Sequence, residues 1–549
     1  MYKTALQEKN SVMTLSKAVD CDADPVILFK KLKDKTHTNR SLQNKILLES
    51  CEIDSKRKLK SILMNRAALR IECLDQQVTI AALTNNGVNA LSILSEIFNV
   101  EIASTDNKKP FIIVTYVSFT ENTKENVDED TRLKQSNPID CLRKIQSAFK
   151  SQSNHEFAIF ICGLFSFDFI ASFEELPNVP FGKNDCADYV FYLAEELIIF
   201  DHQSRRANIC GNIFSGESSE NNYYEQSRKI EKISNEISKL GRIHNSSKIK
   251  ASKSEKAEID CDISDSEYQE TVKDLKNEIA AGNIFQVVPS RTFTIPCADT
   301  LLSYQRLKET NPSPYMFYMQ DEKFTLFGAS PESALKYKKS NNKVELYPIA
   351  GTRPRGKYSN GDIDHDLDKR LEAELKQDQK EIAEHMMLVD LARNDISRIS
   401  NIGSQKIPRL LEIDRYSQVM HLVSCVQGEL KPDLDCFHAY QACMNMGTLT
   451  GAPKIKATEL IRKVENKRRG SYGGAVGYIN THGDMDSCIV IRSAFCKEGN
   501  AHIQAGAGIV FDSEPHLEAQ ETRAKANAVI FAIQQANESA VQNAGQANE

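Results

Sequence analysis

Hydrophobic residues in the N-terminal part of the chain fall mainly in short runs that alternate with polar positions, the pattern of half-buried β-strands. Residues 68–74 and 78–83 are examples, and helical segments lie between such runs. We therefore predict an N-terminal domain of strands and helices over residues 41–214. Residues 1–40 are polar and irregular, and we expect an arm there with one short helix near residues 26–32.

The composition changes further along the chain. Residues 215–262 are dominated by Ser, Asn, Lys and Glu, which predicts a linker. A connecting helix is expected as well, because four apolar residues recur at helical spacing: Ile230, Ile233, Ile237 and Leu240. Residues 263–534 are denser in Gly, Pro and apolar clusters, as expected of the main domain. Residues 535–549 are mostly Gln, Asn, Ala and Glu and predict a disordered tail.

The overall composition is that of an ordinary soluble globular protein. Of 549 residues, 41% are hydrophobic and 26% are charged, and 69 basic residues nearly balance 75 acidic ones. Nothing in this balance indicates a nucleic-acid or membrane partner. The longest apolar stretches fall far short of the roughly 20 residues that a membrane span needs. Since the N-terminus also lacks the apolar region of a signal peptide, we expect a cytoplasmic protein.

The 14 cysteines are scattered, with no C-x-x-C pair and no zinc-type spacing. This pattern is typical of reduced thiols in a cytosolic protein. The sequence also contains no G-x-C-x-G or G-x-S-x-G nucleophile turn. We therefore expect no amidotransferase domain in this chain.

Two segments carry glutamates three residues apart: Glu381 with Glu384, and Glu518 with Glu521. On a helix such residues share a face, so each segment can present two carboxylates in one direction. Two facing helices of this kind would offer only oxygen ligands, which suit Mg²⁺. The spacing alone leaves a second interpretation open, because glutamates three apart are also common on solvated helix faces.

Two glycine-rich segments and two isolated polar residues also stand out. Residues 504–511 can bring backbone N–H groups close to an anion, but a tight strand bend explains the glycines equally well. Residues 447–454 lack the spacing of a nucleotide-binding phosphate loop. His421 and Arg492 lie in apolar surroundings, where a charge needs a partner such as a bound carboxylate. For either residue alone, a structural role is the simpler interpretation.

Together and in this order, these segments resemble the family of chorismate-utilising enzymes, from about residue 47 to residue 527. The resemblance is carried by the following motifs: residues 47–50, 311–317, 348–354, 381–385, 391–395, 447–454, 469–474 and 504–508. It implies an α+β fold of two stacked, mainly antiparallel β-sheets wrapped by helices. It also implies a smaller N-terminal regulatory domain that binds tryptophan, and a catalytic site in a cleft between the sheets.

The resemblance also implies which residues form the site. Mg²⁺, and through it the ring carboxylate of chorismate, would be held by Glu381, Glu384, Glu518 and Glu521. The enolpyruvyl carboxylate would be held by Tyr472, Arg492 and the amides of Gly506, Ala507 and Gly508. Further contacts along the ring are expected from Gly351, Thr352 and Thr448.

The family's catalytic roles fall on matching positions. Glu332 matches the general acid that protonates the departing hydroxyl, and Thr448 is grouped with it as a catalytic residue. His421 matches the residue of the second half-reaction, in which a ring proton is lost and pyruvate leaves. The departures from the family motifs, Cys162 in residues 162–167 and Gln520 between two glutamates, lie outside the ligand positions.

Two positions indicate which nucleophile is added. Gln286 stands where the isochorismate and salicylate synthases carry a lysine base, and a neutral amide cannot deprotonate water. Ala350 stands where the aminodeoxychorismate synthases carry a covalently acting lysine. The resemblance therefore implies that ammonia is added and that anthranilate and pyruvate are the products, as the first step of tryptophan biosynthesis.

Regulation and partners are also implied by the family. Feedback inhibition by tryptophan is expected at a separate site made of Glu49, Ser50, Asn311, Pro312, Ser313, Tyr315, Met316 and Cys488. An amino acid needs an acidic partner for its ammonium group and an apolar slot for its indole, which Glu49 and residues 312–316 would supply. A separate glutamine amidotransferase subunit, component II, is expected to deliver the ammonia within a heterotetramer of two copies of each chain.

Two alternatives remain at this point. A silent tryptophan-binding regulator would keep the fold, but it needs no general acid, so Glu332, His421 and Arg492 argue against it. An aminodeoxychorismate synthase would release a product that is not yet aromatic.

Overall fold

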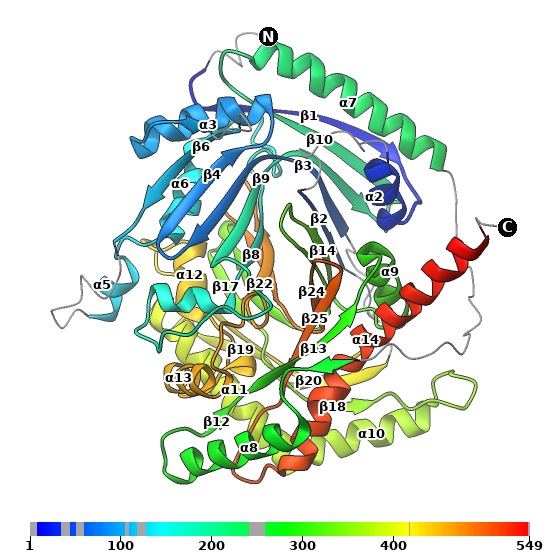
Figure 1. Ribbon diagram of the computed structural model, residues 1–549. Coiled ribbons are helices and arrows are strands. Elements are labelled where there is room, and N and C mark those ends of the chain that lie inside the picture. The colour runs from blue at the N-terminus through cyan, green and yellow to red at the C-terminus, as the bar shows by residue number, and fades with distance from the viewer. Residues whose placement is uncertain are drawn as a thin grey trace.

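The computed structural model describes residues 8–34, 44–50, 60–104, 109–117, 128–240, 259–416 and 418–546. Within these ranges, hydrogen bonds join 23 strands into one branched sheet, while β12 (Gln286–Val287) and β21 (Gly451–Ala452) form a separate pair. In the part of the chain described, the only parallel ladder joins β1 to β7 (Lys150–Ser151). With helices around this sheet (Figure 1), the expected α+β class with a mainly antiparallel sheet is confirmed.

Two long strands, β3 (Lys60–Leu74) and β9 (Tyr189–Asp201), form the hub of the large sheet. Both are buried along almost their whole length, because their apolar residues follow one another instead of alternating. Two rows of strands extend from this pair, one starting at β3 and the other at β9. The two rows stay joined through β3 and β9 in one hydrogen-bonded sheet, so the stacking of two separate sheets stays a prediction.

The first row leaves β3 through successive antiparallel pairs: β2 (Lys45–Glu49), β14 (Tyr315–Gln320), β15 (Thr325–Ser330), β24 (Ser493–Lys497), β25 (Asn500–Gly506) and β13 (Ser290–Pro296). The second row leaves β9 in the same way: β8 (Ile161–Phe165), β22 (Ala475–Ile479), β23 (Met485–Ile489), β16 (Ser333–Lys338), β17 (Lys343–Leu346) and β20 (Val419–Glu429). Strand β20 also pairs with β18 (Ile349–Pro354) and β19 (Lys406–Arg415).

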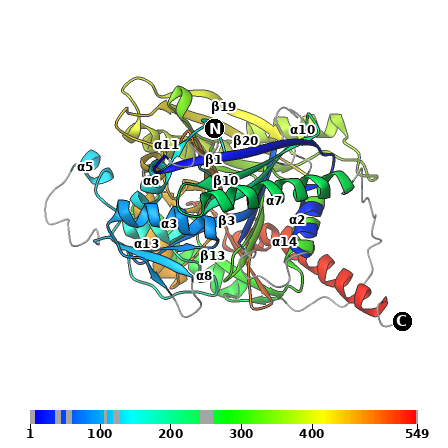
Figure 2. The same cartoon turned by 90° about the horizontal axis from the view of Figure 1, so that it is seen from above.

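The remaining N-terminal elements extend the hub: β1 (Ser11–Asp20), α2 (Pro25–Asp34), β4 (Gln77–Ala82), α3 (Asn85–Phe98), β5 (Ala103–Ser104), β6 (Pro110–Thr115), α5 (Glu129–Leu133), α6 (Ile139–Ala148), η2 (Phe167–Ser172), β10 (Arg206–Phe214) and α7 (Ser219–Leu240). Helix α3 packs on β3 and β4, and α7 lies along β1 and β10, as both views show (Figures 1 and 2). The four apolar residues at helical spacing in α7 are buried in one hydrophobic cluster with Ala207 and Ile209. The predicted connecting helix is thus confirmed, whereas residues 241–258 of the predicted linker lie outside the described residues.

The helices of the C-terminal half surround the two rows: α8 (Asp265–Ala280), α9 (Thr300–Thr310), η3 (Lys339–Asn341), α10 (His365–Gln377), α11 (Gln379–Ile399), α12 (Cys436–Cys443), η4 (Gly447–Leu449), α13 (Lys454–Glu465) and α14 (Pro515–Gln546), with the short strand β11 (Asp260–Cys261) beside β13. Helix α14, red in Figure 1, passes α8, β25 and α9 on its way to the C-terminus. Helix α11 packs against β18 and β20. No helix in the described ranges is long and apolar enough to span a membrane.

Two expectations from the sequence were wrong. The predicted N-terminal arm contains β1, which pairs with β10 from Val12 opposite Phe214 to Asp20 opposite Arg206; only its short helix, α2, was foreseen. The predicted disordered tail instead continues α14 as far as Gln546. Ala and Gln are good helix formers, and Ala536, near the start of this segment, is buried.

Candidate active site

The proposed general acid, Glu332, lies between β15 and β16 and is 6% exposed. The Thr448 hydroxyl in η4 donates a hydrogen bond to Glu332 Oε1 over 3.0 Å. Burial raises the pKa of Glu332 to about 8, although Thr448, the Ile349 backbone, Lys525 and Arg492 act in the opposite direction. At neutral pH the side chain is therefore mostly protonated and can donate a proton.

His421 lies on β20, opposite Thr352 of β18. Its Nδ1 is 2.9 Å from Thr352 Oγ1 and 3.4 Å from the Gly351 carbonyl oxygen. Burial lowers the pKa of His421 to about 4, and the charge of Arg492 lowers it further. The imidazole is therefore neutral at physiological pH and can accept a proton.

Gly351 adopts a φ of +76°, in the region that favours glycine. A Cβ at this position would lie 3.2 Å from Glu381 Oε2. The backbone of β18 therefore passes directly beside the first carboxylate of α11, and glycine provides the space for it.

Both Glu-x-x-Glu segments are helical: Glu381 and Glu384 lie near the start of α11, and Glu518 and Glu521 near the start of α14. Burial raises the pKa of Glu384 to about 7, against the lowering effect of Lys380. The other three carboxylates raise it further. The two helices thus bring their four carboxylates into one electrostatic environment.

Three cationic side chains lie against these glutamates. Arg353 Nη1 donates to Glu381 Oε1 over 2.9 Å, Lys525 Nζ is 2.5 Å from Glu521 Oε1, and Lys380 Nζ is 4.0 Å from Glu384 Oε1. Among the described residues, no three His, Cys, Asp or Glu side chains are already arranged to hold a metal ion. The donor set itself, four mutually repelling carboxylates, has the chemistry that suits Mg²⁺.

Arg492 lies between β23 and β24 and is partly buried. Within the described part of the chain, its guanidinium makes no hydrogen bond or ion pair. Burial lowers the pKa of Arg492, while the charges of Tyr472, Glu521 and Glu332 raise it. A partly buried cation without a partner, next to the acid and the metal-type carboxylates, is suited to bind an anionic substrate.

The glycine-rich segment lies on the same side of the site. A Cβ on Gly506 would be 3.2 Å from Tyr472 Oη, and the Tyr472 hydroxyl is within hydrogen-bonding reach of the Gly506 backbone. The Ala507 amide already donates to the Pro289 carbonyl over 3.3 Å. Of the three amides expected to bind a carboxylate, the amide of Ala507 therefore already has a backbone carbonyl as its hydrogen-bond acceptor.

Gln286, one of the two positions expected to select the nucleophile, faces this segment. It is 6% exposed, its Oε1 has no hydrogen-bond partner among the described residues, and its Nε2 is 2.8 Å from where a Cβ of Gly508 would lie. Ala350 lies on β18 opposite Leu422. A methyl side chain at position 350 has no group that could act covalently.

The residues expected to bind tryptophan lie on and next to three strands. Strands β2 and β14 place Glu49 opposite Met316, with Ser50 following β2 and Asn311, Pro312 and Ser313 preceding β14. The Tyr315 hydroxyl donates to Asp486 on β23 over 3.0 Å, near the buried Cys488.

The expected partner of the tryptophan ammonium, Glu49, is already engaged. Its carboxylate accepts hydrogen bonds from the Tyr304 hydroxyl over 2.6 Å and from Lys308 Nζ over 2.7 Å. Glu49 is 5% exposed. An incoming ammonium group would therefore have to share Glu49 with Lys308 or displace it.

An open groove of about 970 Å³ lies next to the site, between α11 and the start of α13. Met386 and Met387 line it together with Phe285, which is 70% exposed, and Ile455, which is 39% exposed. These side chains form the groove's apolar surface.

A cavity of about 20 Å³ lies between the groove and the acid. It shares Leu391 and Asp395 of α11 with the groove and is also lined by Glu332 and Thr448. The groove and the proposed general acid are thus separated only by side chains of α11 and the η4 loop.

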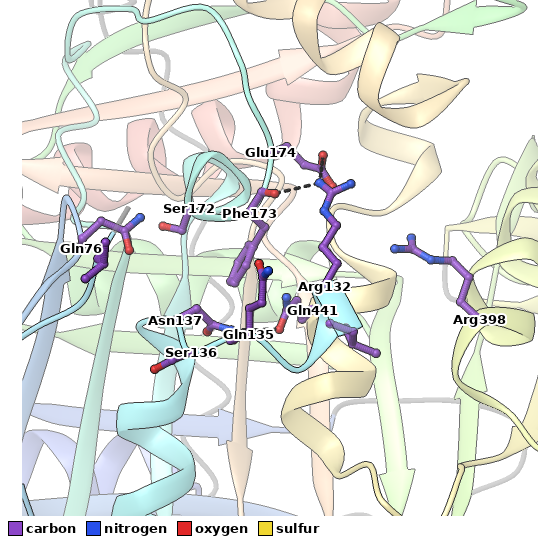
Figure 3. Close-up of a pocket in the computed structure, with 12 residues that line it drawn as sticks. Gln76, Arg132, Gln135, Ser136, Asn137, Ser172, Phe173, Glu174, Arg398 and Gln441 are labelled. Atoms are coloured by element: carbon purple, nitrogen blue, oxygen red, sulfur yellow. Dashed lines mark hydrogen bonds and ion pairs between the residues drawn. The ribbon is translucent and has the colours of Figure 1, made fainter. Parts of the chain in front are cut away.

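A further cavity of about 40 Å³ lies on the other side of the groove (Figure 3). Arg132 donates there to the carboxylate of Glu174 and, over 2.9 Å, to the carbonyl oxygen of Phe173. Arg398 and Gln441 line both spaces. None of the candidate catalytic residues lines this cavity, so it is not part of the site.

Sequence reasoning missed several polar residues that the structure brings to the site. Lys525 Nζ donates to the Gly506 carbonyl over 3.0 Å, in addition to its contact with Glu521. Arg469 is 1% exposed and donates a hydrogen bond to the carbonyl oxygen of Leu449 over 2.8 Å. Leu449 directly follows Thr448. The spacing of Lys525, four residues after Glu521 on a helix, was the available signal for the first of these.

Comparisons with known proteins show which family this chain resembles. A family model described as "chorismate binding enzyme" matches residues 101–531. The chain is 52% identical to anthranilate synthase component 1 of Vibrio cholerae over 490 residues, covering 89% of this chain and 91% of that protein. It is 47% identical to the Escherichia coli protein of the same name over 488 residues, again 89% and 91% of the two chains. A crystal structure of anthranilate synthase component I from Streptococcus pneumoniae superposes with a TM-score of 0.64 at 28% identity, over 93% of this chain and 98% of that one.

Proposed function

Because this chain belongs to the family of chorismate-binding enzymes, and within it to the anthranilate synthase component 1 proteins, we propose that it converts chorismate and ammonia into anthranilate and pyruvate. This reaction opens tryptophan biosynthesis. The observation that carries the proposal is the buried Glu332, whose pKa is raised to about 8, in one site with Arg492 and four metal-type carboxylates.

Chorismate carries two carboxylates, and the site offers a separate partner for each. The ring carboxylate would face the glutamates of α11 and α14 through Mg²⁺, which when bound withdraws electrons from the diene. The enolpyruvyl carboxylate would pair with Arg492, beside Tyr472 and Gly506. Binding at both ends holds the ring in one orientation between the acid and the incoming nucleophile.

Glu332 supports the departure of the ring hydroxyl. Hydroxide is a poor leaving group, so the departing oxygen needs a proton, and Glu332 carries one at neutral pH. The Thr448 hydroxyl, which donates to Oε1, leaves the other carboxyl oxygen to carry the proton. The oxygen then leaves as water while the nucleophile adds to the ring.

The nucleophile would be ammonia, because Gln286 cannot act as a base for water and Ala350 cannot act covalently. In the second half-reaction the ring loses a proton, the enolpyruvyl group leaves as pyruvate and the ring becomes aromatic. His421, neutral at physiological pH and held by Thr352, is suited to accept that proton.

Two regulatory and assembly features belong to the same proposal. Tryptophan would bind at the Glu49 and Met316 pair, apart from the catalytic residues, and inhibit the reaction. A glutamine amidotransferase subunit would supply ammonia, with two copies of each chain in the complex. Its docking surface would be the groove at Phe285 and Ile455, because this groove borders the cavity that reaches Glu332.

The direct test is an assay of the purified chain with chorismate, an ammonium salt and Mg²⁺, followed by anthranilate fluorescence. We expect fluorescence to rise only when all three are present. A product that becomes aromatic only after addition of a lyase would identify an aminodeoxychorismate synthase instead. No consumption of chorismate would identify a regulator without catalytic activity.

A further inference from the structure

One lysine ties three elements together beside the candidate site. Lys454 Nζ forms an ion pair with Asp395 Oδ2 of α11 over 2.7 Å and donates to the Cys443 carbonyl oxygen, the end of α12, over 3.0 Å. Lys454 itself begins α13. Its side chain is 12% exposed and that of Asp395 is 8% exposed, so this pair is largely shielded from water.

The two ends of one loop meet at this lysine. Residues 444–453 connect α12 to α13, and the bond from Lys454 to Cys443 closes the loop at its base. Near its middle the loop lies directly on α11, because a Cβ on Gly447 would be 2.8 Å from Leu391 Cδ1. Both the base and the middle of the loop are therefore fixed relative to the same helix.

This loop carries two parts of the proposed chemistry. Thr448, in its middle, donates the hydrogen bond to Glu332. Near its end, β21 pairs with β12 and places Ala452 opposite Gln286. A shift of the loop would therefore move the partner of the acid and the nucleophile-selecting amide together.

Asp395 also connects the loop to the metal-type carboxylates. It follows Glu384 on α11 by eleven residues, and at about 3.6 residues per turn this is close to three full turns, so both side chains project from the same side of the helix. The position of the loop and the position of the carboxylates are thus set by one rigid element.

We propose that the Lys454–Asp395 pair is a positioning pair, which fixes the loop 444–453 on α11 so that Thr448 and Glu332 stay aligned with the carboxylates of that helix. The inference rests on the proposed function, because it concerns the geometry of the same acid. A buried ion pair adds little net stability compared with apolar residues of similar size. Its contribution is therefore expected in geometry and rate, not in folding.

The test uses the double variant Lys454→Met with Asp395→Leu, which removes the pair without leaving a buried charge unpaired. We expect kcat with ammonium to fall about tenfold or more, with the KM for chorismate within about twofold of wild type. The hydrogen bond from Thr448 lowers the pKa of Glu332. Its loss would therefore move the alkaline limb of the kcat profile to higher pH, with Ile349, Lys525 and Arg492 as the remaining groups that face Glu332.

A matched control is Arg70→Met with Asp321→Leu, a buried ion pair outside the candidate site. It should leave both kcat and the alkaline limb near wild type. The single variant Asp395→Asn, which keeps the shape of the side chain, provides a second measurement and should move the limb in the same direction as the double variant. Wild-type kcat and an unmoved limb in both Asp395 variants would overturn the inference, whereas failure of the wild-type chain to form anthranilate would overturn the proposed function.

Discussion

At the scale of single residues, burial shifts the pKa values of two candidate site residues in opposite directions, and in both cases it favours the neutral form. It raises the pKa of Glu332 to about 8 and lowers that of His421 to about 4. Burial disfavours the charged form of each group, so both are neutral near pH 7. One is thereby kept as a proton donor and the other as a proton acceptor, as the two proposed half-reactions require.

The role of Glu332 predicts a specific pH dependence. Below about pH 8 it is protonated and can donate, and as the pH rises through this value it becomes a carboxylate that cannot, so kcat should fall on the alkaline side. Between pH 4.5, the ordinary pKa of a glutamate, and about pH 8, the folded chain holds a proton that the unfolded chain releases, so the fold becomes less stable as the pH rises through this window. Glu332→Gln should lower kcat by about 10²- to 10⁴-fold with little change in KM, measured as initial rates of anthranilate fluorescence. An unchanged rate in this variant would remove Glu332 from the mechanism.

The role of His421 predicts that the two half-reactions can be separated. His421→Met should still consume chorismate but release a non-aromatic amino intermediate, because the ring proton has no acceptor. Chromatography of the reaction mixture would detect this intermediate and the missing anthranilate. His502→Gln, on β25, is the control and should form anthranilate normally. Normal anthranilate formation by His421→Met would contradict the assignment.

At the scale of elements, two helices present the metal-type carboxylates, and their spacing within each helix could be read from the sequence. Residues three apart share a helix face, so the pairing of Glu381 with Glu384 follows from local geometry. The approach of α14 to α11 could not be read from the sequence, because it depends on packing between segments more than a hundred residues apart.

The repulsion among these carboxylates predicts opposite effects on activity and stability. Glu384→Gln removes one of the repelling charges, so the metal-free chain should unfold at the same temperature as wild type or at a higher one. The same change should abolish Mg²⁺-dependent turnover and the stabilisation by added Mg²⁺. Calorimetry with and without Mg²⁺, together with rates, checks both. Glu270→Gln on the exposed face of α8 is the control, and full activity in Glu384→Gln would refute the metal assignment.

Local patterns also explain what was missed. The hydrogen bond from Thr448 to Glu332 joins residues 116 apart, and the ion pair from Lys454 to Asp395 joins residues 59 apart. No spacing rule relates such positions, because the sheet and the loop bring them together. Strand β1 was missed for another reason: it lies at an edge, and its outer positions are polar.

The pairing of β2 with β14 predicts where tryptophan sensitivity resides. Ser50→Phe or Met316→Thr should relieve inhibition while leaving the uninhibited rate near normal, because both alter the slot beside Glu49. In the wild type, tryptophan should raise the apparent KM for chorismate. Rates at increasing tryptophan concentration measure this, and Met319→Thr, an equally buried residue on the same strand, should stay sensitive. Full sensitivity of both test variants would place the effector site elsewhere.

At the scale of the whole molecule, the hub of β3 and β9 joins the proposed tryptophan-binding segments and the candidate catalytic residues in one sheet. Strand β2 pairs with β3, and β8 pairs with β9 and leads to β16, directly after Glu332. A change at β2 can therefore reach the acid through paired strands without a separate hinge. An effector that favours one arrangement of this sheet inhibits only by as much as it prefers that arrangement.

The groove beside α11 predicts how glutamine is used. With no nucleophile turn in its sequence, the pure chain should use ammonium but not glutamine. With the amidotransferase subunit added, Ile455→Glu or Met387→Glu should lower the glutamine-dependent rate about tenfold while leaving the ammonium-dependent rate within about twofold, since a charge in an apolar interface weakens docking but not chemistry. Ile402→Glu, at a fully exposed position, is the control and should change neither rate. Glutamine use by the pure chain, or wild-type glutamine rates in both groove variants, would show that ammonia does not arrive through a partner at this groove.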